Sequence, residues 1–281
     1  MSAGTPLSAL IPVHQSPAMS DPQELVASPP QAPPAARLDM LRPWGPWATT
    51  AWGLVAMIAW LVGQLAVFVA YAVELMFAHS DAAPDFDRLL SDAGFLAITV
   101  IVSSVAQCGA IVLAVRRAGW PVGDYLGLYR PPRRELAIGL AAITVILVGT
   151  DLLSYALGRD LLPPFMVKTY HAAREGGLLI LLFAAIVVAP IAEEIMFRAF
   201  LFRGWAASRL TVPGTIFLTS AIWASIHLQY DWFGVAQIFC IGILFGYLRW
   251  RSRSTTLTIL LHGVVNLAAA IEAAVIIEYF S

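Results

Sequence analysis

Long apolar runs occupy most of the chain after residue 46, separated by short stretches that carry most of the charged residues. Seven windows are close to the ~20 apolar residues with which a helix crosses the hydrocarbon core of a bilayer. Their approximate limits are 47–77, 93–115, 136–157, 177–201, 210–229, 232–250 and 255–279. The pattern predicts an all-α fold, a polytopic membrane bundle of about seven transmembrane helices.

The composition supports an integral membrane protein. Of the 281 residues, 59% are hydrophobic and 12% are charged, against roughly 25% charged in an average soluble domain. The net charge is -1 and the basic residues are scattered through short loops, so we expect no nucleic-acid partner. The expected partners are the lipid bilayer and a membrane-associated protein or peptide.

The first 45 residues differ from the rest of the chain. They are rich in Pro, Ala and Ser, as in "ASPPQAPPAAR" (27–37), and contain few large apolar residues that could offset the entropy cost of ordering. We predict a disordered cytoplasmic tail over 1–45 and a membrane domain over 46–281. A secretory signal would need a basic start and a short apolar core, whereas the first basic residue is Arg37 and the first apolar window is long, so we expect a retained anchor.

Arginines gather in alternate connections, and this asymmetry predicts the orientation. Under the positive-inside rule, the N-terminus lies in the cytoplasm and the C-terminus outside, in a multi-pass protein of the plasma (inner) membrane. The basic connections follow the second, fourth and sixth windows and hold Arg116, Arg117, Arg130, Arg133 and Arg134, then Arg203 and Arg209, then Arg251 and Arg253.

Three ionisable residues interrupt the fourth apolar window in "APIAEEIMFRAF" (189–200). Ionisable groups inside a membrane span are costly and indicate a function. Glu194 and Arg198 are four residues apart and can pair on one helix face, so we assign them a supporting role. Glu193 is rotated by about 100° and lacks such a partner on its own helix, which makes it the candidate base.

Two histidines lie inside apolar windows, His227 in the fifth and His262 in the seventh, and Asn266 follows His262 by one helical turn. With Glu193 they would provide a base, two imidazoles and an amide around a water molecule. Alone, an intramembrane His or Asn more often forms a hydrogen bond between helices. Their occurrence together with the adjacent glutamates favours a site.

Three short motifs resemble those of a known protease family. "EEIMFR" (193–198) matches EExxxR, "WASIH" (223–227) is similar to FxxxH with Trp223 in place of Phe, and "HGVVN" (262–266) matches HxxxN. In this order they resemble the CPBP family of CAAX-protease and bacteriocin-processing (Abi) intramembrane endopeptidases, which includes type II CAAX prenyl endopeptidases. The resemblance covers about 135–280.

The resemblance implies a division of roles among these residues. Glu193 and His227 would activate a water for attack on a peptide carbonyl, and His262 and Asn266 would stabilise the oxyanion. Glu193, His227 and His262 would also suit zinc as ligands. Because the chain has no HExxH helix, we expect catalysis without a metal and keep zinc as the alternative.

Two other functions use the same residues. A non-catalytic membrane scaffold or regulator would bind a peptide or partner protein in the same polar cavity. A proton-coupled transporter would use the carboxylates as a relay, but no internal repeat supports it. For the protease, the family name suggests a prenylated CAAX protein, whereas a bacterial host would favour a leader or bacteriocin-like peptide.

The site residues can meet only if His227 lies at the same depth in the membrane as Glu193 and His262. At about 1.5 Å per residue, Glu193 and His262 fall in the cytoplasmic half of their spans, and His227 falls nearer the outer face. A shared site therefore requires an offset or broken helix. Pro190 could kink the fourth span, and "QYDW" (229–232) could end the fifth span early.

Overall fold

The computed structural model describes residue 1 and residues 42–78 and 92–280. Most of the predicted tail and the acidic connection after the first span lie outside these ranges. The predictions about them are therefore not addressed by the structure.

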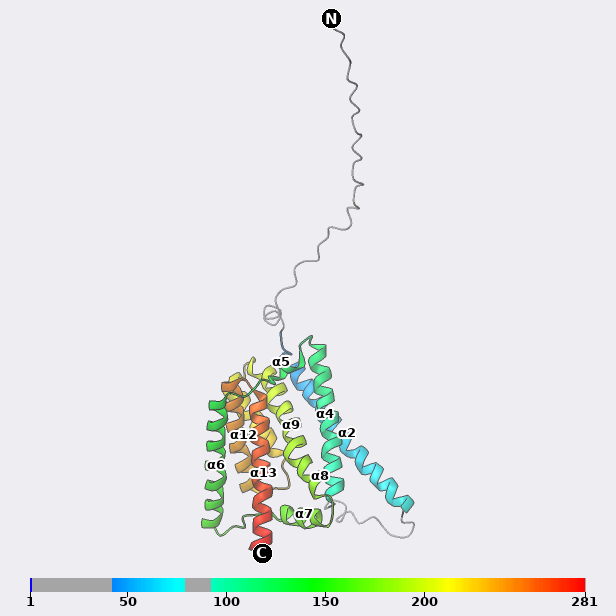
Figure 1. Cartoon of the computed structure of the whole chain (residues 1–281), viewed down its shortest axis with the longest axis vertical. Helices are drawn as coiled ribbons and strands as arrows, with labels where there is room; N and C mark the ends of the chain where they lie inside the picture. Colours follow the sequence, from blue (N-terminus) through cyan, green and yellow to red (C-terminus); the bar gives the residue numbers. More distant parts are fainter. Residues whose placement is uncertain (2–41, 79–91, 281) are drawn as a thin grey trace. The chain divides into compact units, whose positions relative to one another are not determined.

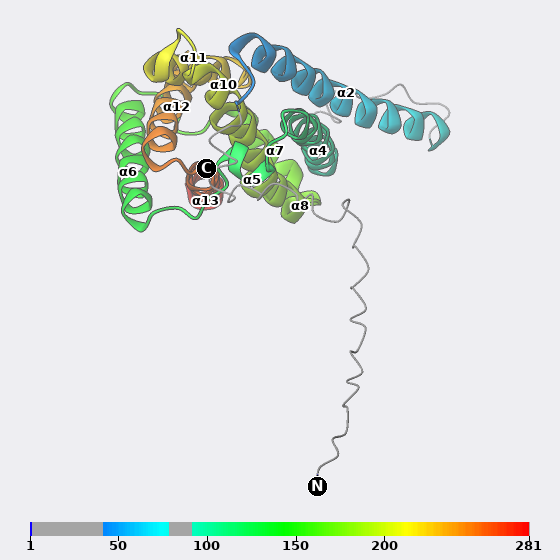
Figure 2. The same ribbon diagram turned by 90° about the horizontal axis from the view of Figure 1, so that it is seen from above.

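All regular structure in the described residues is helical (Figures 1 and 2), which confirms the all-α prediction. A continuous helical segment over 178–206 combines three α-helical and two π-helical (η) pieces. The elements are α2 (Pro46–Ala78), α4 (Ala93–Arg117), α5 (Val122–Leu126), α6 (Arg133–Ala156), α7 (Pro164–Glu175), α8 (Leu178–Phe183), η2 (Ala184–Val188), α9 (Ala189–Glu194), η3 (Ile195–Leu201), α10 (Phe202–Ala206), α11 (Thr211–Ser225), α12 (Trp232–Ser252) and α13 (Thr255–Tyr279).

Six helical segments in the described ranges are long and apolar enough to cross a membrane, and they correspond to six of the seven predicted windows. The remaining window, 210–229, forms α11, which has 15 residues. At 1.5 Å per residue α11 is about 22 Å long, less than the ~30 Å hydrocarbon core. α11 packs against α12, the next long helix, so the two form a pair of neighbouring helices in the bundle. The bundle thus agrees with about seven helices, one of them short.

The segment 178–206 lies among the other helices and contacts α2, α4, α11, α12 and α13. Phe197 and Phe200 from this segment are fully buried and join Phe245 of α12 and Leu261 of α13 in one hydrophobic core. This packing places the "EEIMFR" stretch inside the bundle, away from lipid.

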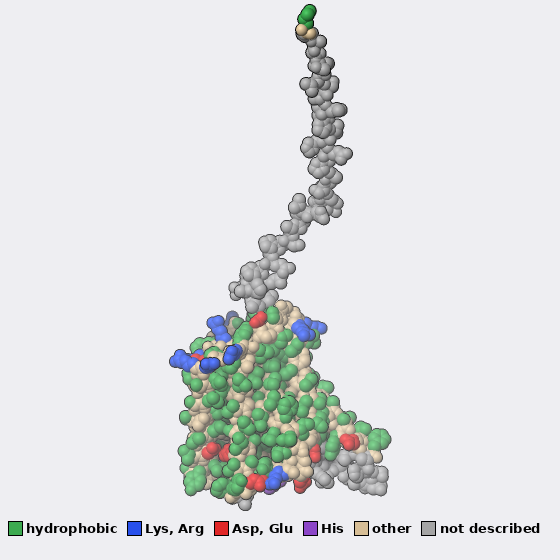
Figure 3. All heavy atoms as spheres, in the orientation of Figure 1, with side chains coloured by type: hydrophobic (Ala, Val, Ile, Leu, Met, Phe, Trp, Pro, Cys, Tyr) green, Lys and Arg blue, Asp and Glu red, His purple; other side chains and the backbone are tan. Residues whose placement is uncertain are grey.

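The two ends of the bundle differ in charge (Figure 3). Arginines gather at the end where α10 and α12 finish, and most acidic side chains lie toward the opposite end. At that opposite end, Arg159 pairs with Asp231, and Arg174 pairs with Glu278. The charge separation agrees with the loop asymmetry from which the orientation was predicted.

Candidate active site

Two π-helical pieces flank the short helix that carries the glutamates. Ala189 donates its backbone N–H to the Ala184 carbonyl in the π pattern, and Pro190 has no N–H to give to the next carbonyl, that of Ala185. Asn266 Nδ2 of α13 donates to this carbonyl oxygen at 2.7 Å. The Ala185 carbonyl, in the irregular helix before Glu193, therefore receives its hydrogen bond from a side chain of the candidate site.

Gly263 lets α13 approach this backbone closely. A Cβ atom at position 263 would lie 2.9 Å from the Ile186 carbonyl oxygen, which is closer than real Cβ contacts allow. The position of His262 and Asn266 relative to the glutamates therefore depends on the absence of a side chain at residue 263.

The predicted pair between Glu194 and Arg198 is present. Arg198 Nη1 donates to Glu194 Oε1 at 3.0 Å, and both side chains are fully buried. The Arg198 guanidinium also lies over the Trp223 ring, 4.2 Å from its centroid. Two buried charges are tolerated here because each is compensated by the other and by nearby polar and aromatic groups.

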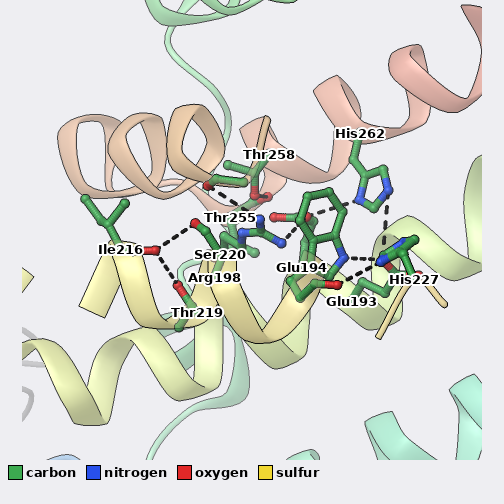
Figure 4. A network of polar contacts seen from close by, with 12 residues as sticks. Glu193, Glu194, Arg198, Ile216, Thr219, Ser220, His227, Thr255, Thr258 and His262 are labelled. Carbon is green, nitrogen blue, oxygen red and sulfur yellow. Dashed lines mark hydrogen bonds and ion pairs between the residues drawn. The ribbon is translucent and has the colours of Figure 1, made fainter. Parts of the chain in front are cut away.

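Glu194 has a second partner that its spacing from Arg198 does not reveal. His262 Nδ1 lies 3.1 Å from Glu194 Oε1 (Figure 4). A carboxylate accepts, so Nδ1 carries the proton, and this hydrogen bond fixes the orientation of the imidazole ring. The other ring nitrogen, Nε2, lies 4.0 Å from Glu193 Oε2.

Glu193 has its hydrogen-bond partner on another helix. Trp223 Nε1 of α11 donates to Glu193 Oε2 at 2.6 Å. The donor is 30 residues away, so spacing along one helix does not reveal it. The Glu193 side chain is 26% exposed, whereas that of Glu194 is fully buried. Glu193 is thus the carboxylate that a water or substrate can reach.

The early end of α11 explains how His227 can lie beside the other site residues, although a straight helix would place it nearer the outer face. The helix ends at Ser225, and His227 lies in the turn that follows. Its Nδ1 is 2.7 Å from the Trp223 carbonyl oxygen. Because a carbonyl only accepts, Nδ1 donates and Nε2 is left as an acceptor. The Trp223 ring contacts both histidines edge-on, with centroids 5.2 Å from each.

A cavity of about 690 Å³ connects these groups. Trp223, His227, His262 and Asn266 line it, and Glu193 contacts two of these lining residues, Trp223 and His262. The cavity extends to the bundle end that carries the pair of Arg159 and Asp231, which are also lining residues. Of the six predicted site residues, His227, His262 and Asn266 therefore line the cavity. The other three lie behind this wall, where Glu193 and Glu194 contact His262, and Arg198 pairs with Glu194.

Trp223 is the residue whose role the sequence did not reveal. As part of "WASIH" it counted only as an aromatic replacement for Phe. Its indole N–H gives it a bond to Glu193 that Phe cannot make, and its ring stacks against Arg198. The replacement of Phe by Trp in this motif adds an N–H donor, and this was the feature of the sequence that could have predicted a hydrogen bond from residue 223.

Within the described residues, no three His, Cys, Asp or Glu side chains lie close enough together to hold a metal ion. The zinc set of Glu193, His227 and His262 is therefore not assembled in this arrangement.

The fold and the site together define a polytopic helical membrane protein with a buried Glu–Arg pair and a partly exposed glutamate beside a cavity that two histidines line. Residues 175–268 match the family model described as type II CAAX prenyl endopeptidase Rce1-like. This match confirms the resemblance predicted from the three motifs, and it covers all six candidate residues.

One curated relative gives a second comparison. It is an "Uncharacterized 24.3 kDa protein" of Escherichia coli, which is 29% identical over 127 residues. The aligned part covers 44% of this chain and 57% of the relative, so the chain spans little more than half of the relative's length. A comparison with the solved structures finds no match.

Proposed function

We propose that this protein is an intramembrane endopeptidase that hydrolyses a peptide bond in a membrane-associated protein or peptide. The observation that carries the proposal is the position of the Glu193 carboxylate. It is partly exposed, held by Trp223 Nε1 at 2.6 Å and 4.0 Å from His262 Nε2, beside a cavity that His227 lines. The match to the Rce1-like family over all the site residues supports the same reaction.

The first step is attack by water. Glu193 takes a proton from a water molecule in the cavity, and the acceptor Nε2 of His227 holds the water's other proton. The water oxygen bonds to the peptide carbonyl carbon and forms a tetrahedral intermediate. A positioned base of this kind typically contributes about 10²- to 10⁴-fold to the rate.

The oxyanion then needs donors. Asn266 uses one amide hydrogen for the Ala185 carbonyl and has a second one available. His262 Nε2 donates when the ring is an imidazolium, which would lie between Glu194 Oε1 at 3.1 Å and Glu193 Oε2 at 4.0 Å. Each such donor is worth about 3 kcal/mol to the transition state. When the intermediate collapses, the C–N bond breaks and Glu193 returns its proton to the leaving amine.

The cavity also favours one side for substrate entry. If the arginine-rich end faces the cytoplasm, the end with Arg159 and Asp231 faces the other side of the plasma (inner) membrane. A substrate would then enter from the non-cytoplasmic side. This arrangement favours a leader or bacteriocin-like peptide over a prenylated cytoplasmic protein.

The direct test is cleavage of a panel of membrane peptides by the purified full chain. We expect Glu193→Gln and His227→Ala to fold and to lose cleavage, because Gln cannot accept the proton and Ala cannot hold the water. Glu175→Gln, at the exposed end of α7, serves as the matched control and should cleave normally. Cleavage by Glu193→Gln at the wild-type rate would exclude the mechanism. A chelator arm decides between the metal-free reaction and a zinc-dependent one.

A non-catalytic scaffold is the second candidate, because His262 and Asn266 each make a hydrogen bond to another helical segment. In that case the cavity binds a peptide without cutting it. Glu193→Gln would then leave peptide binding intact, and no substrate of the panel would be cleaved by the wild type.

A further inference from the structure

A second cavity, of about 610 Å³, lies at the arginine-rich end of the bundle. It is formed by the end of the 178–206 segment and the C-terminal end of α12, whereas the active-site cavity uses the N-terminal half of α12. The two cavities are therefore distinct. The residues that line the second are Phe202, Arg203, Ala206, Ala207, Arg249, Trp250, Arg251 and Arg253.

Arg249 is the most deeply buried of the four arginines, with 6% of its surface exposed. Its Nε donates to Thr255 Oγ1 at 2.9 Å, and its guanidinium lies over the Phe202 ring. Gly127 makes room for it: a Cβ there would be 2.6 Å from Arg249 Nη2. No carboxylate of the described residues forms an ion pair with Arg249, so no described residue neutralises its positive charge.

Arg203 is in a similar situation. Its guanidinium lies over the rings of Trp120 and Tyr125, and its Nη1 is buried with no hydrogen-bond partner in the described part of the chain. Asp124 acts on Arg203 only at longer range and already accepts from the Tyr129 hydroxyl. Arg203 and Arg249 also repel each other.

The other two arginines contribute unequally to the positive charge at the cavity. Arg251 is neutralised by Glu135 at 3.0 Å, whereas Arg253 is exposed at the end of α12 and has no ion pair among the described residues. Three guanidinium groups that have no ion pair within 42–78 and 92–280 thus line one cavity. Burying a charge without a partner is costly, so such a cluster is stable when an anion completes it.

We propose that the cavity lined by Arg203, Arg249 and Arg253 binds a phosphate group, supplied by the headgroup of an anionic phospholipid. Guanidinium groups match phosphate oxygens with paired hydrogen bonds. Basic pockets between membrane helices at the cytoplasmic side suit acidic lipid headgroups, and Trp250, half exposed beside the cavity, is typical of that depth.

The test measures the thermal unfolding midpoint of the full chain in an uncharged detergent. Phosphatidylglycerol, phosphatidylcholine or inorganic phosphate is added in turn. We expect phosphatidylglycerol to raise the midpoint by about 3 °C more than phosphatidylcholine. Arg203→Gln and Arg249→Gln should each lose most of this shift. Arg116→Gln, an exposed arginine of α4 outside the cavity, should keep it.

The measurement with inorganic phosphate distinguishes a lipid headgroup from free phosphate as the ligand. If inorganic phosphate alone gives the shift and the two cavity variants lose it, the site stands and takes free phosphate. An equal lipid shift in the wild type and in both cavity variants would overturn the proposal, since a general surface charge effect would then explain it.

A second measurement uses the wild type only, in case a variant fails to fold. Phenylglyoxal modifies accessible arginines, and mass spectrometry locates the products. Phosphatidylglycerol should slow modification of Arg203 and Arg253 and leave that of Arg116 unchanged. Equal modification rates at Arg203 and Arg253 with and without the lipid would contradict a bound phosphate.

Discussion

Glu193 and Glu194 are neighbours in the chain and differ in what surrounds them. Glu194 is fully buried and bonded to both Arg198 and His262, so it holds the site together. Glu193 is partly exposed and bonded to Trp223. Their order in the helix explains the difference, because a step of about 100° turns one side chain into the core and the other toward Trp223 of α11.

The bond from Trp223 to Glu193 leads to a prediction at this scale. Trp223→Phe removes the indole N–H but keeps an aromatic ring against Arg198 and the histidines. We expect the variant to fold and to cleave about tenfold more slowly, since a hydrogen bond to a charged group is worth about 1.5–3 kcal/mol. The rate should stay above that of Glu193→Gln. An unchanged rate in the peptide cleavage assay would show that Trp223 does not position Glu193.

The buried pair of Glu194 and Arg198 leads to a second prediction. Arg198→Met leaves the Glu194 carboxylate buried without its main partner, and we expect the free energy of unfolding to fall by about 3–5 kcal/mol. The double variant Glu194→Gln, Arg198→Met removes both charges and should be clearly more stable than Arg198→Met alone. Unfolding in a denaturing detergent measures both. If the single and double variants are equally stable, the charge pair is not what holds this helix in place.

At the scale of elements, the site depends on irregular helix geometry. The 178–206 segment changes to π-helix on both sides of the glutamates, and α11 ends at Ser225. The first change frees the Ala185 carbonyl for Asn266, and the helix end brings His227 to the cavity. Straight, complete helices would not bring these side chains together.

The close contact between α13 and η2 leads to a third prediction. Gly263→Ala places a methyl group against the Ile186 carbonyl and pushes α13 away, together with His262 and Asn266. We expect cleavage to fall by roughly 10- to 100-fold, because a displacement of about 1 Å at a catalytic group has costs of that order. Gly149→Ala in α6, where a Cβ would meet nothing within 4 Å, is the control and should remain active. Equal activity of the two variants would exclude a role for this contact.

At the scale of the whole molecule, the position of the active-site cavity predicts which side of the membrane admits substrate. Gln229 lines the cavity at the end with Asp231, and Arg116 is exposed near the end of α4. In a background with Cys108→Ala and Cys240→Ala, we expect a membrane-impermeant maleimide outside intact cells to label Gln229→Cys and not Arg116→Cys. The reverse labelling would place the cavity mouth in the cytoplasm and favour a cytoplasmic substrate.

The order and approximate limits of the six long helical segments could be read from the sequence, whereas the short helix α7 and the early end of α11 could not. A bilayer offers no partners for backbone N–H and C=O groups, so an apolar run of sufficient length has to form a helix. The six candidate site residues were also proposed from the sequence, because ionisable and amide side chains are rare in such runs. Helical spacing alone was enough to pair Glu194 with Arg198.

Only the tertiary structure decided how these residues connect. Trp223 reaches Glu193 across 30 positions, His262 reaches Glu194 across 68 and Asn266 reaches Ala185 across 81. Such bonds depend on where each helix bends, ends and packs, and the periodicity of a single helix carries no information about its neighbours. The sequence therefore determined which polar side chains lie within the apolar helices, and the packing of α9, α11 and α13 decided which carboxylate is fully buried and which stays partly exposed.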